Sequence, residues 1–393
     1  MKKKMLALLL TVAMVVSFAG CGTKANNTPV GEATTDTAAT DDAAATTAAT
    51  DDANNTSSGD SASGYELALV TDLGTIDDKS FNQGAWEGLT KYAEEKGISY
   101  KYYQPAEGTD AAYLETIGLA VEGGAKLVVC PGYLFEYPVY EAQTQYPDVK
   151  FILLDGEPHT VDYATYKTEA NVAPILYSEQ QAGFLAGYAA VKDGYTKLGF
   201  MGGMAVPAVI RYGYGFIQGA DYAAQELGIK AVDIQYHYTG AFVASPEAQA
   251  MAAAWYQNGT EVIFGCGGAV GNSVMAAAEA ANAKVIGVDV DQSSESASVI
   301  TSAMKMLSNS VYDEVTAYYD NKFTGGKTTI FDASNNGIGL PMETSKFNKF
   351  TQADYDAIFA KLVSGEVVPA KDDAAESAEK VPVKVVKVTE VTE

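Results

Sequence analysis

Polar side chains that could bind a small molecule are concentrated in the stretch 69–83, Leu-Val-Thr-Asp-Leu-Gly-Thr-Ile-Asp-Asp-Lys-Ser-Phe-Asn-Gln. Its apolar start predicts a buried strand, and the carboxylates that follow, beginning with Asp72, form a loop at the carboxyl end of this strand. Open α/β sheets bind their ligands at this edge. Phe81 and Asn82 come next in the sequence. Together these residues could stack on a flat ring and accept hydrogen bonds from its polar groups.

A helix is expected to begin directly after this loop. Ser80 and Gln83 have the S-x-x-Q spacing of a capping box, in which each side chain binds a backbone N–H at the start of a helix. Apolar residues continue at helical spacing as far as Gly97. The sequence therefore predicts a helix over 80–96 with Phe81 in its first turn.

Strand and helix patterns alternate along the chain in two consecutive sets, which is typical of parallel sheets covered by helices. The first set predicts strands at 66–71, 100–103, 126–130 and 150–154 and helices at 80–96, 110–122, 134–146 and 177–192. The second set predicts strands at 197–201, 232–236, 261–264 and 284–288 and helices at 206–227, 246–258 and 272–281. A strand at 298–303 and a helix at 304–319 that crosses back are expected next, and the segment beyond Lys371 could be an edge strand or a frayed end.

The repeated order of elements predicts an α/β fold of two Rossmann-like lobes with parallel sheets, joined by a hinge of several crossovers. The expected boundaries are 65–195 for the N-terminal lobe and 196–303 for the C-terminal lobe, while 304–393 completes both. Such a hinged clamp would bury a ligand between the carboxyl ends of its two sheets.

Residues at or just after the predicted strand ends are the candidates for this cleft. In the first lobe they are Asp72, Phe81, Asn82, the turn 130–132 and Asp155. In the second lobe they are Gly202-Gly203, Phe242, Gly267-Gly268 and Asp289. The glycine pairs favour tight turns over phosphate binding, because no complete phosphate-binding motif follows either strand. Residues 212–216 are expected to pack a helix on its sheet, with Arg211 at the surface or the cleft rim.

Composition argues against several classes of function. The 393 residues carry 50 acidic and 26 basic side chains, a formal net charge of −24, whereas nucleic acids and anionic membranes attract basic patches. Two histidines and three cysteines are too few and too scattered for a zinc site. No cofactor or metal is expected, and Cys130 and Cys266 are predicted to stay separate buried thiols, because a bridge would lock the clamp.

The beginning of the chain is predicted to direct export and anchoring. Residues 1–20 contain three lysines and an apolar run that is too short to span a membrane, as in a secretory signal. Phe18-Ala-Gly-Cys21 resembles the bacterial lipobox, so Cys21 is expected to carry the lipid that anchors the protein on the extracytoplasmic face of the cell membrane. The small and polar residues of 21–64 cannot offset the entropy of ordering, so this segment is predicted to be a disordered tether.

Several segments between Tyr65 and Leu340 together resemble the basic membrane protein family. Its members are lipid-anchored substrate-binding components of ABC transporters and include purine nucleoside receptors of spirochaetes. The matching segments are Asp78-Lys-Ser-Phe-Asn82, Phe151-Ile-Leu-Leu-Asp155, Gly183-Phe-Leu-Ala-Gly187, Gly215-Phe-Ile-Gln-Gly219, Gly287-Val-Asp-Val-Asp-Gln292 and Thr301-Ser-Ala-Met-Lys305. The resemblance implies a type I periplasmic-binding-protein fold, a nucleoside ligand with a preference for purines, an ABC transporter permease as partner, and no catalytic activity.

The resemblance also implies roles for individual residues. The two phenylalanines that enclose the base in that family match Phe81 and Phe242, and the carboxylate that binds the edge of the base matches Asp155. The groups that hold the ribose match Asp72, Gly267, Asp289 and Lys305. A stacked aromatic ring contributes ~1–3 kcal/mol with little preference among bases, so the polar groups would have to select the ligand.

Two other functions remain open. Residues 71–78 superficially resemble the D-x-D-x-G-x-D-D calcium cluster of nucleoside hydrolases, in which a bound cation activates water. However, Val70 occupies the first acidic position, and Thr75 inserts a residue before the last pair. A sugar or autoinducer receptor of similar lobed architecture would instead need polar and indole contacts to a ring without a base.

Overall fold

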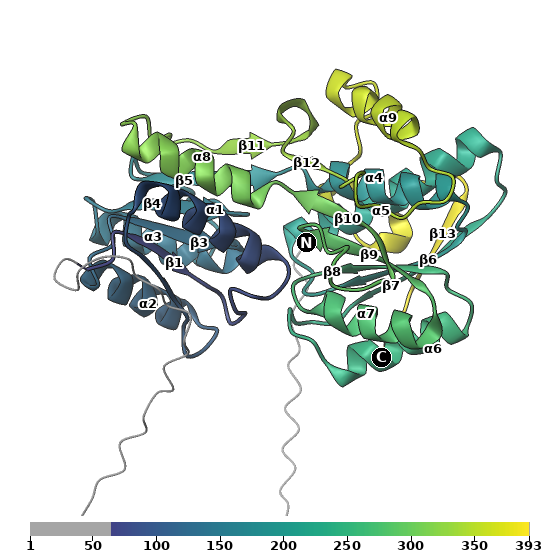
Figure 1. Ribbon diagram of the computed structural model, residues 1–393, viewed down its shortest axis with the longest axis horizontal. Helices are drawn as coiled ribbons and strands as arrows, with labels where there is room; N and C mark the ends of the chain where they lie inside the picture. Colours follow the sequence, from purple (N-terminus) through teal and green to yellow (C-terminus); the bar gives the residue numbers. More distant parts are fainter. Residues whose placement is uncertain (1–63, 393) are drawn as a thin grey trace, which may run out of the picture. The chain divides into compact units, whose positions relative to one another are not determined.

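Two separate sheets organise the chain, and helices cover both faces of each sheet (Figure 1). The structure is a computed structural model that describes residues 64–392. The predicted signal peptide 1–20, the expected lipidation site Cys21 and the predicted tether up to residue 63 lie outside the described residues. The mainly parallel sheets with covering helices confirm the predicted α/β class and the two-lobed arrangement.

The first sheet contains six parallel strands in the order β11-β5-β4-β3-β1-β2. Its strands are β1 (Leu67–Val70), β2 (Tyr100–Tyr103), β3 (Leu127–Pro131), β4 (Lys150–Leu154), β5 (Val172–Tyr177) and β11 (Thr329–Phe331). The helices that cover it are α1 (Phe81–Lys96) and α8 (Leu307–Tyr319) on one face, and α2 (Asp110–Glu122), η1 (Tyr133–Phe135) and α3 (Glu136–Gln145) on the other. We call this sheet and its helices the N-terminal lobe.

The second sheet has seven strands in the order β12-β10-β9-β8-β6-β7-β13, of which β12 is antiparallel to β10. Its strands are β6 (Lys197–Gly202), β7 (Val232–Tyr238), β8 (Val262–Cys266), β9 (Lys284–Asp289), β10 (Val299–Lys305), β12 (Ile338–Gly339) and β13 (Val386–Glu390). The covering helices are α4 (Glu179–Asp193) and α5 (Pro207–Leu227) on one face, and α6 (Pro246–Gln257) and α7 (Val270–Ala281) on the other. This is the C-terminal lobe, and the remaining short elements are α9 (Gln352–Ser364), η2 (Ala333–Asn335), η3 (Asp372–Ala374) and η4 (Ala378–Lys380).

Both lobes share one strand order. In each lobe the first five strands in sequence lie in the order 2-1-3-4-5, as β2-β1-β3-β4-β5 and β7-β6-β8-β9-β10. The order reverses between β1 and β3 and again between β6 and β8. Ligands of open parallel sheets bind outside the carboxyl ends of the strands at such a reversal.

Burial on both faces explains the apolar strands. Leu67 and Leu69 in β1 pack on the side of α1 and α8, while Ala68 and Val70 pack on the side of α2 and α3. All four side chains are fully buried. A parallel strand that is covered on both faces is therefore apolar at every position instead of alternating.

Within residues 64–392 the chain passes between the lobes at three places. These crossovers are the steps from β5 to α4, from β10 to α8 and from β11 to β12, at residues 177–179, 305–307 and 331–338. These connecting segments form a hinge about which the lobes can rotate while both sheets stay intact.

Helices α4 and α5 pack unusually closely because glycines face the partner helix on both sides. A Cβ atom on Gly183 or Gly187 would lie 2.1 Å from a backbone oxygen of α5, and one on Gly215 or Gly219 would lie 2.2 or 2.0 Å from a backbone oxygen of α4. Any larger residue would force the helices apart. These glycines fix the start of α4, and with it Glu179, relative to α5.

The structure differs from the sequence prediction at two places. The sequence predicts a helix over 177–192 in the first lobe, but strand β5 ends at Tyr177 and α4 packs against β10 and β12 of the second sheet. Pro174 explains why the sequence analysis did not recognise β5, because proline usually marks the edge or end of a strand. In the structure the neighbouring strand β11 begins opposite Ile175, so Pro174 has no partner residue in β11.

The second difference concerns the end of strand β10, and the structure also decides between the two alternatives for the tail. Residues 304 and 305 were predicted to start a helix, but they extend β10, and α8 begins at Leu307. The tail beyond Lys371 contains β13, which pairs in parallel with β7 at the edge of the second sheet. Its alternating Val and Lys residues therefore form the edge strand that the sequence left open.

Candidate ligand-binding site

A cavity of about 660 Å³ lies at the carboxyl ends of strands from both lobes. Its walls include most cleft candidates of the sequence analysis, whereas Gly202, Gly203 and Cys130 do not line it. The candidates that do include Asp72, Phe81, Asn82, Asp155, Phe242, Gly267, Asp289 and Lys305. The size is in the range of small-molecule pockets, about 300–1,000 Å³. Residues up to 233 positions apart in the sequence are thus brought to one place, 72 and 305 being the most distant.

The start of α1 is capped by a different residue than the sequence predicts. The side chain of Ser80 makes no capping hydrogen bond. Instead, the carboxylate of Asp78 accepts hydrogen bonds from the backbone N–H groups of Ser80, Asn82 and Gln83, at 2.8, 3.0 and 3.1 Å. The Ser80 hydroxyl is therefore available to donate to Asp289 Oδ2 in the C-terminal lobe, at 2.6 Å.

Asn82 is held in one orientation by two carboxylates. Its Nδ2 group donates to Asp72 Oδ1 at 2.8 Å and to Asp78 Oδ2 at 3.2 Å. Its Oδ1 atom is buried and has no hydrogen-bond partner among the described residues. Because the nitrogen is held on one side, the oxygen is presented as an acceptor.

Asp155 and Asp289 occupy equivalent places in the two lobes. Asp155 follows β4 and Asp289 ends β9, and both have left-handed backbone conformations, with φ of 58° and 66°. Such conformations are uncommon for residues other than glycine and cluster at functional sites. Burial raises the pKa of Asp289, and the neighbouring Lys305 and the Ser80 hydroxyl oppose this shift.

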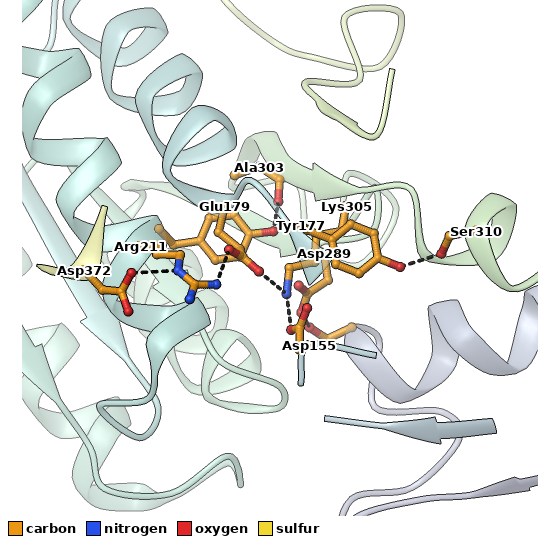
Figure 2. A network of polar contacts seen from close by, with 11 residues as sticks. Asp155, Tyr177, Glu179, Arg211, Asp289, Ala303, Lys305, Ser310 and Asp372 are labelled. Atoms are coloured by element: carbon orange, nitrogen blue, oxygen red, sulfur yellow. Dashed lines mark hydrogen bonds and ion pairs between the residues drawn. The ribbon is translucent and has the colours of Figure 1, made fainter. Parts of the chain in front are cut away.

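Lys305 connects the two lobes at the cavity wall (Figure 2). It is almost fully buried at the end of β10, where its ammonium group forms an ion pair with Asp155 and lies 3.4 Å from Glu179 Oε1. Burial alone would lower the pKa of Lys305, but Asp155, Glu179 and Asp289 raise it above its usual value. Lys305 therefore favours its charged form, and its ion-pair partners are Asp155 and Glu179, while Asp289 lies near enough to act on it electrostatically.

Asp155 keeps one oxygen available despite this ion pair. Its Oδ2 atom contacts Lys305, whereas its buried Oδ1 atom has no hydrogen-bond partner among residues 64–392. The hydroxyl of Tyr113, another residue of the cavity wall, is also buried and unpartnered within this range. The cavity wall thus carries buried polar groups that the protein itself does not satisfy, which is unusual outside functional sites.

The two phenylalanines line the cavity from different lobes. Phe81 begins α1, and its ring centre lies 4.8 Å from Lys305 Nζ. Phe242 lies in the loop between β7 and α6, where its ring packs on the backbone of Gly203 and Gly267. A Cβ atom on Gly203 would lie 2.5 Å from Phe242 Cδ1, so this glycine leaves room for the ring.

The glycine turns fit the structural interpretation made from the sequence. Gly267 and Gly268 have φ of 145° and 52° and form the tight turn after β8. Gly203 N donates to Cys266 O at 2.8 Å, which ties the ends of β6 and β8 together. Cys130 and Cys266 are free and buried, which confirms that they remain separate thiols.

Sequence reasoning missed four residues around Lys305. Tyr177 and Glu179 lie at the crossover from β5 to α4, which the sequence analysis assigned to a helix. Tyr212 was assigned to helix packing, yet it also lines the cavity and its hydroxyl donates to Ala303 O. Arg211 was expected at the surface or the cleft rim; its side chain is 20% exposed and pairs with Glu179 and Asp372, which the sequence analysis did not anticipate. The position of Arg211 within the otherwise apolar run 206–217 could have indicated that its charge is paired inside the protein.

None of the helices in 64–392 is both long and apolar enough to cross a membrane. Over the same part of the chain, no group of three or more His, Cys, Asp or Glu side chains is placed to hold a metal ion.

The fold, with a cavity between two lobes, is that of the periplasmic-binding-protein class. A solute-binding protein of an ABC transporter system from Aeropyrum pernix K1 has a similar fold, with a TM-score of 0.68 and 23% identity, over 79% of this chain and 95% of that one. Residues 65–372 match the Bmp family, described as ABC transporter substrate-binding protein PnrA-like. The chain belongs to this family, and its function is to capture a solute for an ABC transporter.

Curated relatives agree with this assignment. The ABC transporter nucleoside-binding protein BmpA of Lactococcus lactis is 31% identical over 341 residues, which cover 80% of this chain and 92% of the relative. Basic membrane protein A2 of Borrelia garinii is 27% identical over 318 residues, which cover 80% and 90%. The resemblance stated from the sequence is thereby confirmed at the level of the family.

Proposed function

We propose that this protein captures nucleosides, with purine nucleosides as the preferred class, and delivers them to an ABC transporter permease without chemical change. The observation that carries the proposal is the combination, in one cavity, of two phenylalanines and buried polar atoms without partners in the described chain. The name of the Lactococcus relative, a nucleoside-binding protein, supports the same ligand class.

In this proposal the base lies between Phe81 and Phe242, and Asp155 binds its edge. The free Oδ1 of Asp155 would accept a base N–H, while Lys305 holds Oδ2 and keeps the carboxylate in place. Asn82 Oδ1 offers a second acceptor. Hydrogen bonds to an ionised carboxylate are strong, which suits the selection of a base by its edge.

The ribose would lie beside Asp72, Gly267, Asp289 and Lys305. Carboxylates can accept hydrogen bonds from vicinal hydroxyl groups, and Lys305 compensates part of their charge. Asp289 already accepts from Ser80 across the two lobes. A ligand bound there would contact both lobes and would stabilise their closed arrangement.

The geometry of the Asp-rich loop favours binding over hydrolysis. Asp72 Oδ1 accepts from Gly74 N and from Asn82 Nδ2, and both oxygens of Asp78 accept backbone N–H groups. A calcium ion would have to displace these donors. The proposed function therefore includes no enzymatic step.

The sugar or autoinducer alternative lacks its expected indole contact. The chain has two tryptophans. Trp86 packs on Tyr100 and Tyr102, Trp255 is buried in the core of the C-terminal lobe, and neither lines the cavity. The ring-stacking groups of the cavity wall are phenylalanines and tyrosines.

Isothermal titration of the purified protein with inosine, guanosine, adenosine, cytidine, ribose and calcium tests the proposal, together with an assay for released base. We expect nucleosides to bind, purines more tightly than cytidine, and no base to be released. Tight binding of ribose without nucleoside binding would favour the sugar receptor. Steady release of base that is lost in Asp72→Ala would establish the hydrolase.

A further inference from the structure

A continuous chain of charged side chains leads from the cavity wall to the C-terminal segment (Figure 2). Asp155 pairs with Lys305, Lys305 lies 3.4 Å from Glu179 Oε1, and Glu179 Oε2 lies 3.3 Å from Arg211. On its other side, Arg211 Nε donates to Asp372 Oδ1 at 2.8 Å. The first two members line the cavity, whereas Glu179, Arg211 and Asp372 do not.

Glu179 is placed to act on Lys305. Its side chain is 1% exposed and lies at the crossover from β5 to α4, and the close contact of α4 with α5 fixes that position. Each of its carboxylate oxygens faces a different cation. Glu179 therefore competes with Asp155 for Lys305, and the strength of this competition depends on its second partner, Arg211.

The charge balance around Lys305 shows why Arg211 matters. Asp155, Glu179 and Asp289 all act on this one ammonium group. An unpaired buried carboxylate is costly, so Glu179 without Arg211 would draw Lys305 away from Asp155. With Arg211 in place, Glu179 is already compensated, and Lys305 can remain on Asp155.

Asp372 holds Arg211 in this position from outside the lobe core. It lies at the start of η3, in the segment that leads to the edge strand β13. The same segment is attached to α5 by a second, uncharged contact: Gln218 Nε2 donates to Ala370 O, and Gln218 Oε1 accepts from Ala370 N. The charged and uncharged attachments can therefore be removed separately.

We propose that Glu179 and Arg211, with Asp372 as their outer anchor, are positioning residues that hold Lys305 on Asp155 and thereby set the affinity for the ligand without touching it. This inference rests on the proposed function for its effect on nucleoside binding. Its structural part, the partner of Lys305, is independent of the ligand.

Titration with inosine separates the charged chain from simple attachment of the tail. We expect Arg211→Gln to weaken binding roughly ten-fold, within the range for directly coupled side chains, and Arg211→Lys to restore part of the loss. Asp372→Asn, a partly exposed site, should weaken binding about three-fold. Gln218→Ala, which loosens the same segment without a change of charge, should leave the affinity within about two-fold.

A double-mutant cycle with Asp155→Asn gives a readout that a merely structural role would not change. If Arg211 acts through Lys305 and Asp155, Arg211→Gln should cost almost nothing in the Asp155→Asn background. Additive losses, or equal effects of Asp372→Asn and Gln218→Ala, would overturn the proposal. Asp372→Asn keeps the test usable if Arg211→Gln does not fold.

A crystal structure of the ligand-free Arg211→Gln or Asp372→Asn protein distinguishes this inference from the proposed function. We expect Lys305 Nζ to move from Asp155 towards Glu179. If the wild-type protein binds no nucleoside, the proposed function fails, and the position of Lys305 still decides the inference. A Lys305 that stays on Asp155 in both variants refutes it.

Discussion

Replacement of Phe242 by alanine is the sharpest test of the two-sided aromatic cavity. Phe242 belongs to the C-terminal lobe and Phe81 to the N-terminal lobe, so each can stack on only one face of a base. Loss of one stacked ring costs ~1–3 kcal/mol, a fall in affinity of roughly five-fold to more than a hundred-fold. Phe242 is the cleaner choice, because Phe81 also lies against Lys305 at 4.8 Å.

Titration of Phe242→Ala with inosine and with ribose measures this loss. The affinity for inosine should fall by the stated amount, while any weak binding of ribose should hardly change, since ribose has no aromatic face. Phe359→Ala is a matched control: this half-buried phenylalanine of α9 packs on Tyr355 and does not line the cavity. An unchanged inosine affinity in Phe242→Ala, with Phe359→Ala also unchanged, would show that the second stacking ring is misplaced.

Four further substitutions test the polar groups, the anchor and the start of α1. Asp155→Asn should alter the ranking of inosine, guanosine and adenosine in titrations while binding persists. Asp289→Ala should instead reduce the preference for ribonucleosides over deoxyribonucleosides. An unchanged ranking in the first variant and an unchanged preference in the second would contradict the assigned roles. We expect a lipid with two acyl chains on Cys21 to be the membrane anchor, since one chain binds only marginally and two hold firmly. Cys21→Ser should therefore release the protein from the membrane fraction, and continued sedimentation with membranes would exclude a lipid as the anchor. Burial raises the pKa of Asp78 from 3.8 to about 6, so the folded protein binds the proton more tightly than the unfolded chain. Well below pH ~4 the Asp78 carboxyl is protonated in both the folded and the unfolded protein. As the pH rises through about 6, the folded protein must give up a proton that it binds more tightly, which lowers the free energy of unfolding by up to about 3 kcal/mol. Denaturant unfolding of wild type and Asp78→Asn should show this loss only in the wild type, and parallel pH profiles would disprove it.

Local sequence patterns predicted most of the elements and many residues of the cavity, while Lys305 was named only through the family resemblance. Strands such as β1 and β4 are short apolar runs, and the polar residues that follow them, Asp72 and Asp155, must lie at the carboxyl edge of a sheet. Because the same order of elements occurs twice, two such edges were expected. The prediction needed only the chain on either side of each strand end.

Details within these elements were less predictable where several residues compete for the same backbone groups. Ser80 and Gln83 have the spacing of a capping box, but Asp78 accepts the N–H groups at the start of α1. A carboxylate that can reach three donors displaces a hydroxyl that can reach one. The sequence shows all three candidates and does not show which one the folded backbone places closest.

Only the tertiary structure decided how the charged residues are paired. Lys305 lies close enough to Asp289 to act on it, as expected, but its ion pair is with Asp155, 150 residues away. Arg211 and Asp372 are 161 residues apart and meet because the tail returns along α5 to reach β7. A local pattern carries no information about such distant partners, since the pairing depends on where the chain crosses between the lobes and on how closely α4 and α5 pack.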